Sequence, residues 1–201
     1  MTVIGITGPS GAGKGEVSRI LQNKYEFAVI DADGIYHSLV SAPSPCLDEI
    51  IFHFGKGVIN SLGALDRQAL GKRVLGESNR DKLLLLNDIT HKYVVKEIQD
   101  KIKYYSRRKT NCVIDAPLLI EAGLGIDCDF TVSVLADDCV RIERISKRDK
   151  ISTHDAKIRI SSQKSDDFYI SNTDYSIVNN GDIYLLEASV SRILSERRVI
   201  N

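Results

Sequence analysis

The sequence lacks the features that mark secreted, membrane-spanning and nucleic-acid-binding proteins. Its four cysteines form no Cys-x-x-Cys pair, so neither a zinc site nor a disulfide framework is expected. No apolar run approaches the length of a membrane span and no secretory signal opens the chain, so we expect a cytoplasmic protein that binds no membrane. The 27 basic and 27 acidic residues cancel, which gives no overall attraction to nucleic acid. Small molecules are therefore the expected partners.

Internal repeats and low-complexity tracts are lacking as well, which favours one compact domain for 201 residues that are 43% hydrophobic. Short apolar runs alternate with helical stretches, a pattern typical of buried parallel strands in an α/β fold. These runs are Val3–Thr7, Phe27–Asp31, Cys112–Asp115, Phe130–Leu135 and Ser176–Val178.

A long helical segment separates the second and third runs. Its apolar residues keep the three-to-four spacing of a helix face: Leu86, Ile89, Tyr93, Val94, Ile98, Ile102 and Tyr105. We expect this insertion to pack as a helical subdomain. The segment Pro43-Ser44-Pro45 is interpreted as a turn within it, and Ile183–Arg197 as a closing helix.

A glycine-rich segment follows the first apolar run directly: Gly8-Pro9-Ser10-Gly11-Ala12-Gly13-Lys14-Gly15. Glycines let the backbone N–H groups turn toward phosphate oxygens, the next helix presents its positive end, and Lys14 adds a mobile charge. A plain turn is the alternative, but the strand before the loop and the helix pattern after it favour a phosphate-binding loop. We predict nucleotide binding by Gly11, Ala12, Gly13, Lys14, Gly15 and Glu16.

Position 15 departs from the pattern Gly-x-x-x-x-Gly-Lys-[Ser/Thr], because Gly15 has no hydroxyl to ligate magnesium. Magnesium is then expected to be held by nucleotide phosphates and water, with acidic side chains in the outer shell. Glu16 places a negative charge in the first helical turn, which suits the helix dipole but could repel a phosphate.

Acidic residues end two of the predicted strands, at the edge where open parallel sheets bind ligands. Asp33, in Asp31-Ala32-Asp33-Gly34, is the candidate general base that accepts a proton from a substrate hydroxyl. Asp115 is the candidate magnesium ligand, directly or through water. For each acid the alternative is a helix or strand cap, and for Asp31 and Asp115 the two interpretations weigh equally.

Basic residues cluster after the fourth run, where Arg144 and Arg148 lie four apart on one helix face with Arg141 and Lys147 nearby. Two guanidinium groups on one face can bind one anion and neutralise charge on a transferred phosphoryl group. The alternative is a solvated charged helix, since acidic residues are interleaved.

Over nearly its whole length the chain resembles the dephospho-coenzyme A kinases. The resemblance rests on motifs in a fixed order: Gly8–Lys14, Val29–Asp33, Phe54-Gly55, Leu65–Leu70, Asn87 with His91, Asp115–Glu121, Arg144–Asp149, Gln163 and Asp174–Gly181.

This resemblance implies transfer of the γ-phosphoryl group of ATP to the ribose 3′-hydroxyl of dephospho-coenzyme A, with Mg2+. It implies a three-layer P-loop kinase fold: a parallel five-stranded sheet, with the core at about 1–35, 109–140 and 170–201, a helical acceptor-binding insertion at about 36–108, and a lid at about 141–169.

The resemblance also implies site residues. Lys14, Asp33, Arg144 and Arg148 would be catalytic, and Arg144, Asn180 and Gly181 would join the loop in binding the nucleotide. The acceptor would lie near Thr7, Asp33, Arg67, His91, Leu119 and Glu121. Structural alternatives stay open: His91 as a hydrogen-bonding helix residue, and Asn180 with Gly181 as a turn.

Two other functions remain open at this point. One is a different small-molecule or nucleoside monophosphate-type kinase, for which glycine after the loop lysine is common. The other is a non-catalytic nucleotide-binding regulator. A GTPase is disfavoured, because no Asn-Lys-x-Asp-like segment follows the later strands.

Overall fold

A computed structural model of the chain describes residues 1–41, 43–76 and 79–200. The contacts between residues divide the chain into two compact units, Met1–Ile30 with Ile102–Asn201 and Asp31–Lys101. Each unit has a hydrophobic core of its own.

The first unit is built on a five-stranded parallel sheet in the order β2-β3-β1-β4-β5. Its strands are β1 (Val3–Thr7), β2 (Ala28–Asp31), β3 (Cys112–Asp115), β4 (Phe130–Leu135) and β5 (Tyr175–Val178). All five lie where the sequence predicted them, with starts that differ by one residue in β2 and β5, so the predicted α/β fold class is confirmed. Buried apolar runs identified these strands because both faces of the sheet are covered.

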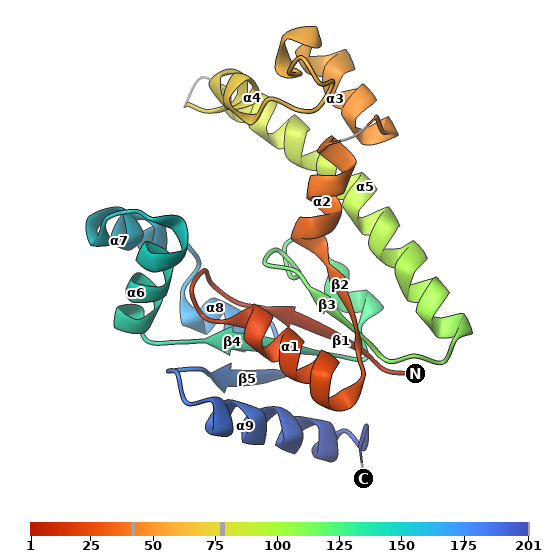
Figure 1. The fold of residues 1–201 in the computed structure, drawn as a ribbon, viewed down its shortest axis with the longest axis vertical. Helices are drawn as coiled ribbons and strands as arrows, with labels where there is room; N and C mark the ends of the chain where they lie inside the picture. The colour runs from red at the N-terminus through yellow and green to blue at the C-terminus, as the bar shows by residue number, and fades with distance from the viewer. Residues whose placement is uncertain (42, 77–78, 201) are drawn as a thin grey trace. The chain divides into compact units, whose positions relative to one another are not determined.

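Helices lie on both faces of this sheet (Figure 1). On the first face, α1 (Lys14–Tyr25) and α9 (Ile183–Glu196) pack their apolar sides against β1, β4 and β5. On the other, η3 (Leu124–Asp127) contacts β1, and α8 (Asp166–Ser171) contacts β4 and β5. Two helices, α6 (Asp138–Asp149) and α7 (Thr153–Ser161), follow β4 and pack on each other.

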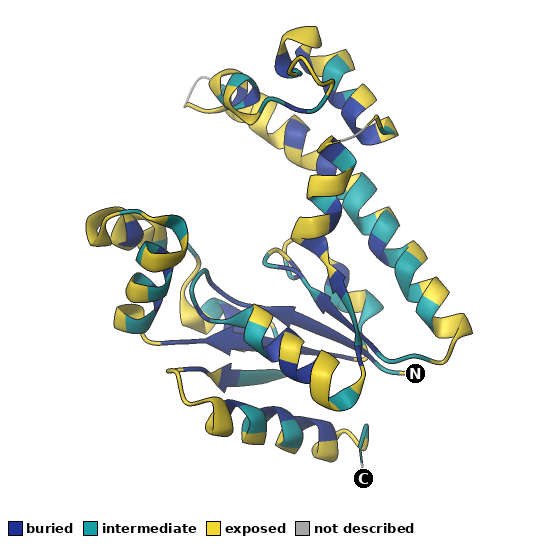
Figure 2. Ribbon diagram, in the orientation of Figure 1, coloured by how far each residue is buried: buried dark blue, intermediate teal, exposed yellow. Residues whose placement is uncertain are grey.

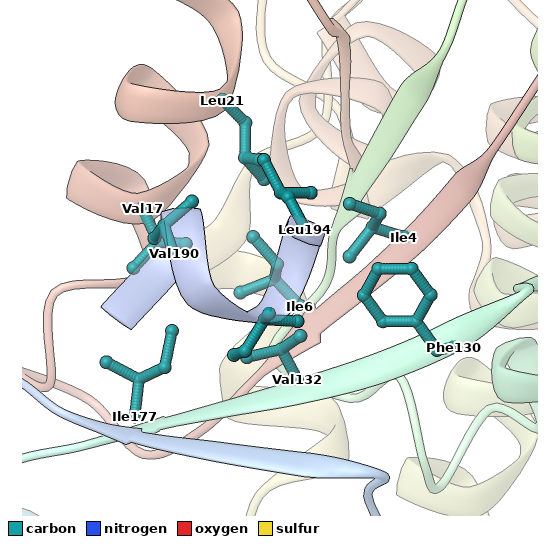
Figure 3. A pocket seen from close by; sticks show the side chains of 10 residues that line it. Ile4, Ile6, Val17, Leu21, Phe130, Val132, Ile177, Val190 and Leu194 are labelled. Atoms are coloured by element: carbon teal, nitrogen blue, oxygen red, sulfur yellow. The ribbon is translucent and has the colours of Figure 1, made fainter. Parts of the chain in front are cut away.

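The core between α1, α9 and the sheet is closely packed (Figure 3). Ile4 and Ile6 of β1 meet Val17 and Leu21 of α1 there, and the space left among these side chains is about 10 Å³. Such a space is no larger than a single water, so this region serves stability and binds no ligand.

The second unit is helical, with α2 (Ala32–Ser41), α3 (Pro45–Phe54), η1 (Lys56–Val58), α4 (Arg67–Val74) and most of α5 (Arg80–Arg107). Its core joins residues of α2, α3, α4 and α5, and buried residues alternate with exposed ones along these helices (Figure 2). Ser44 caps α3 and Pro45 begins that helix, so the predicted turn at Pro43–Pro45 is a helix start. In the described residues, no helix has the length and apolarity needed to cross a membrane.

Candidate functional site

The connection from β1 to α1 has the backbone of a phosphate-binding loop. Gly8, Gly11 and Gly13 have φ angles of 137°, 81° and 96°, a region that glycine enters without steric cost. Gly13 is the N-cap of α1, so the unpaired N–H groups of the first helical turn begin at the loop. A helix N-terminus framed by glycines can bind an anion.

Lys14, the first residue of α1, extends its side chain back over the loop. Its ammonium nitrogen donates to the carbonyl oxygens of Gly8, at 2.8 Å, and Pro9, at 3.3 Å. The positive charge therefore lies beside the loop backbone, where a bound phosphate would meet it.

Arg144 and Asn179 hold the other side of the loop. Nη1 of Arg144 donates to the carbonyl oxygens of Gly11 (3.2 Å), Ala12 (3.2 Å) and Asn179 (3.0 Å). The side-chain amide of Asn179, a residue only 5% exposed, donates to the Ala12 carbonyl at 2.9 Å. A Cβ added to Gly13 would lie 2.2 Å from that amide nitrogen, so glycine is also required for packing there.

Ser10 is tied to two further residues through its backbone. Its N–H donates to Oε1 of Gln163 at 3.2 Å, and its carbonyl accepts from Nε of Arg141 at 3.1 Å. Arg141 also donates to Gln163 at 2.7 Å and to Asp138 at 2.9 Å. Because Arg141 is only 4% exposed, this network holds a buried cation against the loop.

Arg148, at the end of α6, lies at the outer side of the loop. It donates to both carboxylate oxygens of Asp149, at 2.7 and 2.9 Å, and to the hydroxyl of Ser10 at 3.2 Å. Arg159 of α7 also pairs with Asp149. Hydrogen bonding to Arg148 is the main cause that lowers the pKa of Asp149 to about 2, and Arg159 contributes. One carboxylate thus joins the arginines of two helices.

A groove of about 520 Å³ adjoins the loop and is large enough for part of a nucleotide. Its lining contains five of the predicted nucleotide-binding residues: Gly13, Gly15, Glu16, Arg144 and Gly181. Arg19, Asn179, Ile183 and Leu186 complete the lining. The predicted residue Asn180 is paired instead with the backbone and carboxylate of Asp137, at 2.9 and 3.0 Å.

The charge of Glu16 is balanced by Arg19, whose Nη2 lies 2.5 Å from the Glu16 carboxylate. The two residues are three apart on α1 and both line the groove. Arg19 therefore offsets the repulsion of phosphate that an isolated Glu16 would cause.

Asp115 ends β3 beside α1, where the hydroxyl of Ser18 donates to its carboxylate at 2.8 Å. Among the described residues no three His, Cys, Asp or Glu side chains are grouped as a metal site. A carboxylate and a hydroxyl are nevertheless oxygen donors of the kind that Mg2+ accepts, and this ion usually keeps several waters. The residues present thus fit a magnesium ion bound mainly by phosphates and water.

Asp31 and Asp33 differ in their surroundings. Asp31 accepts a hydrogen bond from the Gly34 N–H at 3.1 Å, which makes it a cap at the start of α2. Asp33, in the first turn of α2, is exposed. Of the two acids, Asp33 is the one that presents its carboxylate to solvent without that capping bond.

The predicted acceptor-binding residues divide into buried and accessible ones. The Thr7 hydroxyl donates to the Pro117 carbonyl at 3.0 Å, and Leu119 packs against Gly5 in the core. Glu121 is exposed after β3, and His91 is half-buried on α5. Arg67 begins α4 and contacts both the ring nitrogen of His37 and the face of Tyr36.

Four residues at the loop were not among the predicted site residues: Ser18, Arg141, Gln163 and Asn179. Arg141 was interpreted only as one of a basic cluster, yet it lies four residues before the buried Ile145 and shares its side of α6. That spacing is a signal of burial that sequence reasoning could have used. Gln163 and Asn179 lie in motifs that carry the resemblance, although no role was assigned to them, and Ser18 carried no such signal.

Comparison with known proteins gives one consistent result. A family model described as dephospho-CoA kinase matches residues 2–184. The chain is 35% identical over 201 residues to a dephospho-CoA kinase of Saccharomyces cerevisiae, covering 98% of this chain and 83% of that one. It is 36% identical over 197 residues to a dephospho-CoA kinase of Carboxydothermus hydrogenoformans, covering 98% and 94%.

Solved structures agree in fold. TT1252 from Thermus thermophilus has a TM-score of 0.78 at 26% identity, with 97% of each chain covered. A dephospho-CoA kinase from Campylobacter jejuni has a TM-score of 0.69 at 22% identity, covering 97% of this chain and 96% of that one. A shikimate kinase from Acinetobacter baumannii, in complex with shikimate, has a TM-score of 0.58 at 16% identity, covering 99% and 94%.

Proposed function

From its membership of the dephospho-CoA kinase family, to which this chain belongs, we propose that it moves the γ-phosphoryl group of ATP to the ribose 3′-hydroxyl of dephospho-coenzyme A. The chain is a kinase of the P-loop fold. Beyond family membership, we propose that ATP is the phosphoryl donor, that magnesium is the cofactor and that individual residues have specific roles.

One observation carries the choice of a nucleoside triphosphate: the phosphate loop opens directly onto the groove of about 520 Å³. The phosphates would lie on the N–H groups from Gly11 to Glu16, beside Lys14. The nucleoside would then occupy the groove along Gly181, with Asn180 at its edge. Arg144 would border both parts.

The chemistry needs a base for the attacking hydroxyl and positive charge on the moving phosphoryl group. We assign the base to Asp33, which would orient the 3′-hydroxyl and accept its proton as the bond to phosphorus forms. Lys14, Arg144 and Arg148 would stabilise the charge that grows on the phosphoryl and leaving oxygens. Magnesium, when bound, supplies further positive charge to the phosphates, and Asp115 would hold it through water.

The acceptor is proposed to bind to the helical insertion at about 36–108, and the lid at about 141–169 is proposed to exclude water during transfer. Arg67 would contribute a cation for the acceptor's phosphates, while His91 and Glu121 would border its remaining parts. Thr7 and Leu119 would affect acceptor binding only through the shape of the pocket, because both are buried.

The test is a coupled assay of ADP release by the purified chain with several acceptors. We expect turnover with dephospho-coenzyme A and ATP, and little with AMP, CMP or shikimate. Preference for one of those three would instead identify another small-molecule kinase. ATP binding without turnover of any acceptor would identify a nucleotide-binding regulator.

The role of Asp33 is tested by Asp33→Asn beside Asp31→Asn, because asparagine at position 31 still offers an oxygen to the Gly34 N–H. We expect Asp33→Asn to lower turnover by roughly a hundredfold or more with ATP binding nearly unchanged. Asp31→Asn should stay close to the parent. The opposite result would move the base to Asp31.

A further inference from the structure

Ser18 and Asp115 form a partly buried polar contact between α1 and β3. Ser18 lies in α1, one turn beyond Gly15, and is only 4% exposed. Its hydroxyl donates to Oδ2 of Asp115, the last residue of β3, at 2.8 Å. A serine hydroxyl has one proton, so this bond fixes the direction in which that proton points and restricts the carboxylate.

Gly15 leaves space on the same side of α1. A Cβ built on Gly15 meets no atom of the described residues within 4 Å, and this glycine is not among those with positive φ. Neither backbone conformation nor crowding therefore requires glycine there. Position 15 lines the nucleotide groove with Arg19, and on a helix it lies next to position 18 three residues on.

A phosphate loop with serine or threonine at this position supplies a hydroxyl to the magnesium ion. Gly15 cannot, so a water molecule must take that place if the ion keeps its usual six ligands. The Ser18 hydroxyl, one helical turn from position 15, and the Asp115 carboxylate that it contacts are oxygen donors of the kind that can bind such a water.

We propose that Ser18 is a positioning residue that orients Asp115 toward a magnesium-bound water in the space left by Gly15. The inference rests on the proposed use of ATP with magnesium. Outer-shell hydrogen bonds of this kind commonly change metal affinity by about 10- to 100-fold. The chain thus compensates in α1 for the hydroxyl missing from its loop.

The competing explanation is that the Ser18 hydroxyl only ties α1 to β3. That role would affect folding stability, and would weaken ATP binding equally with and without magnesium. A magnesium titration of nucleotide binding separates the two, because it compares the same folded variant with itself.

The experiment measures binding of a fluorescent ATP analogue in EDTA and at increasing Mg2+. For Ser18→Ala we expect the Mg2+ concentration at half-maximal effect to rise about tenfold, with affinity in EDTA within about twofold of the parent. Ser18→Thr keeps a hydroxyl and should keep the parent response. Ser133→Ala removes a fully buried hydroxyl elsewhere in the sheet and should leave the Mg2+ response unchanged.

Gly15→Ser gives a second, independent test, since a side chain fits there. It should lower the half-maximal Mg2+ concentration severalfold, and should restore the response in the Gly15→Ser/Ser18→Ala double variant. The proposal would be overturned if Ser18→Ala lowered nucleotide affinity equally in EDTA and in Mg2+. It would also be overturned if Gly15→Ser left the half-maximal Mg2+ concentration unchanged. Failure of the parent to bind ATP at all would instead contradict the proposed function.

Discussion

The side-chain amide of Asn179 donates to the carbonyl oxygen of Ala12 across 2.9 Å, joining residues 167 positions apart in the chain. Arg144 reinforces this contact by donating to both residues' carbonyl oxygens. The shape of the phosphate loop therefore depends on the segment after β5 as well as on its own glycines.

Replacing Asn179 with alanine should loosen the loop. The Ala12 carbonyl would lose one buried donor, which costs about 1–3 kcal/mol in the free energy of unfolding. We expect ATP affinity to fall about tenfold as well, an amount that corresponds to about 1.4 kcal/mol. Urea unfolding and nucleotide titration measure the two effects. Asn180→Ala is the control for stability, because Asn180 and its partner Asp137 are exposed.

Alanine should have opposite effects at Gly13 and Gly15. At Gly13 a Cβ would lie 2.2 Å from the Asn179 amide nitrogen, with φ at 96°, so Gly13→Ala should abolish nucleotide binding and lower stability. At Gly15 nothing in the described residues obstructs a Cβ, and alanine is favoured over glycine in a helix by up to about 1 kcal/mol. Gly15→Ala should therefore be neutral to stabilising. Equal loss of stability in both variants would contradict the assignment of strain to Gly13.

Arg141 should contribute more to stability and to ATP binding than its place in a charged helix suggests. Arg141→Met keeps the apolar stem but removes the donors to Ser10 and Gln163, while Asp138 stays solvated with a side chain 70% exposed. We expect the free energy of unfolding to fall by about 2 kcal/mol, and KM for ATP to rise about tenfold.

The control for this variant is Arg192→Met on α9, where the arginine is exposed. That change should stay within about 0.5 kcal/mol of the parent. A similar loss in both variants would show that charge or helix content, and not the contact with the loop, explains the Arg141 result.

Strands and loops of this protein could be predicted from the sequence where their residues form a continuous local pattern. The strand Val3–Thr7 and the glycines after it form one continuous pattern, so both the strand and the loop could be identified. The same holds for Phe130–Leu135, whose six residues are all buried. Strand starts such as Ala28 were off by one residue, because Phe27 is buried beside the strand without belonging to it.

The candidate site was less predictable, since its supporting contacts are long-range. Ser10 meets Arg141 and Gln163 across 131 and 153 positions, and no local pattern encodes such a pairing. The helical spacing of Arg141 from Ile145 indicates burial, but it does not say which loop atoms the guanidinium contacts. For Glu16, too, the pairing with Arg19 is a matter of side-chain conformation, which the helical spacing permits but does not require.

The cysteines offer a test of burial that is independent of catalysis. All four are free; Cys139 is exposed, whereas burial raises the pKa of Cys46 and Cys112 to about 11 and of Cys128 to about 12. The thiolate is the reactive form, so an alkylating reagent at pH 8 should label Cys139 quickly and the other three only after unfolding. Mass spectrometry of the labelled peptides measures this. Fast labelling of Cys128 in the folded chain would contradict the packing of its thiol against Gly5.

The raised thiol pKa of Cys128 also predicts how stability depends on pH. The unfolded thiol ionises near its ordinary value of about 9, whereas the folded thiol ionises near 12, so the unfolded chain releases its proton first. The contribution of this group is therefore fully present below pH 9 and is lost as the pH rises toward 12. We expect the difference in free energy of unfolding between the parent and Cys128→Ala to shrink by about 1.4 kcal/mol from pH 8 to pH 10. A constant difference over that range would mean that the Cys128 thiol ionises equally easily in the folded and unfolded chains.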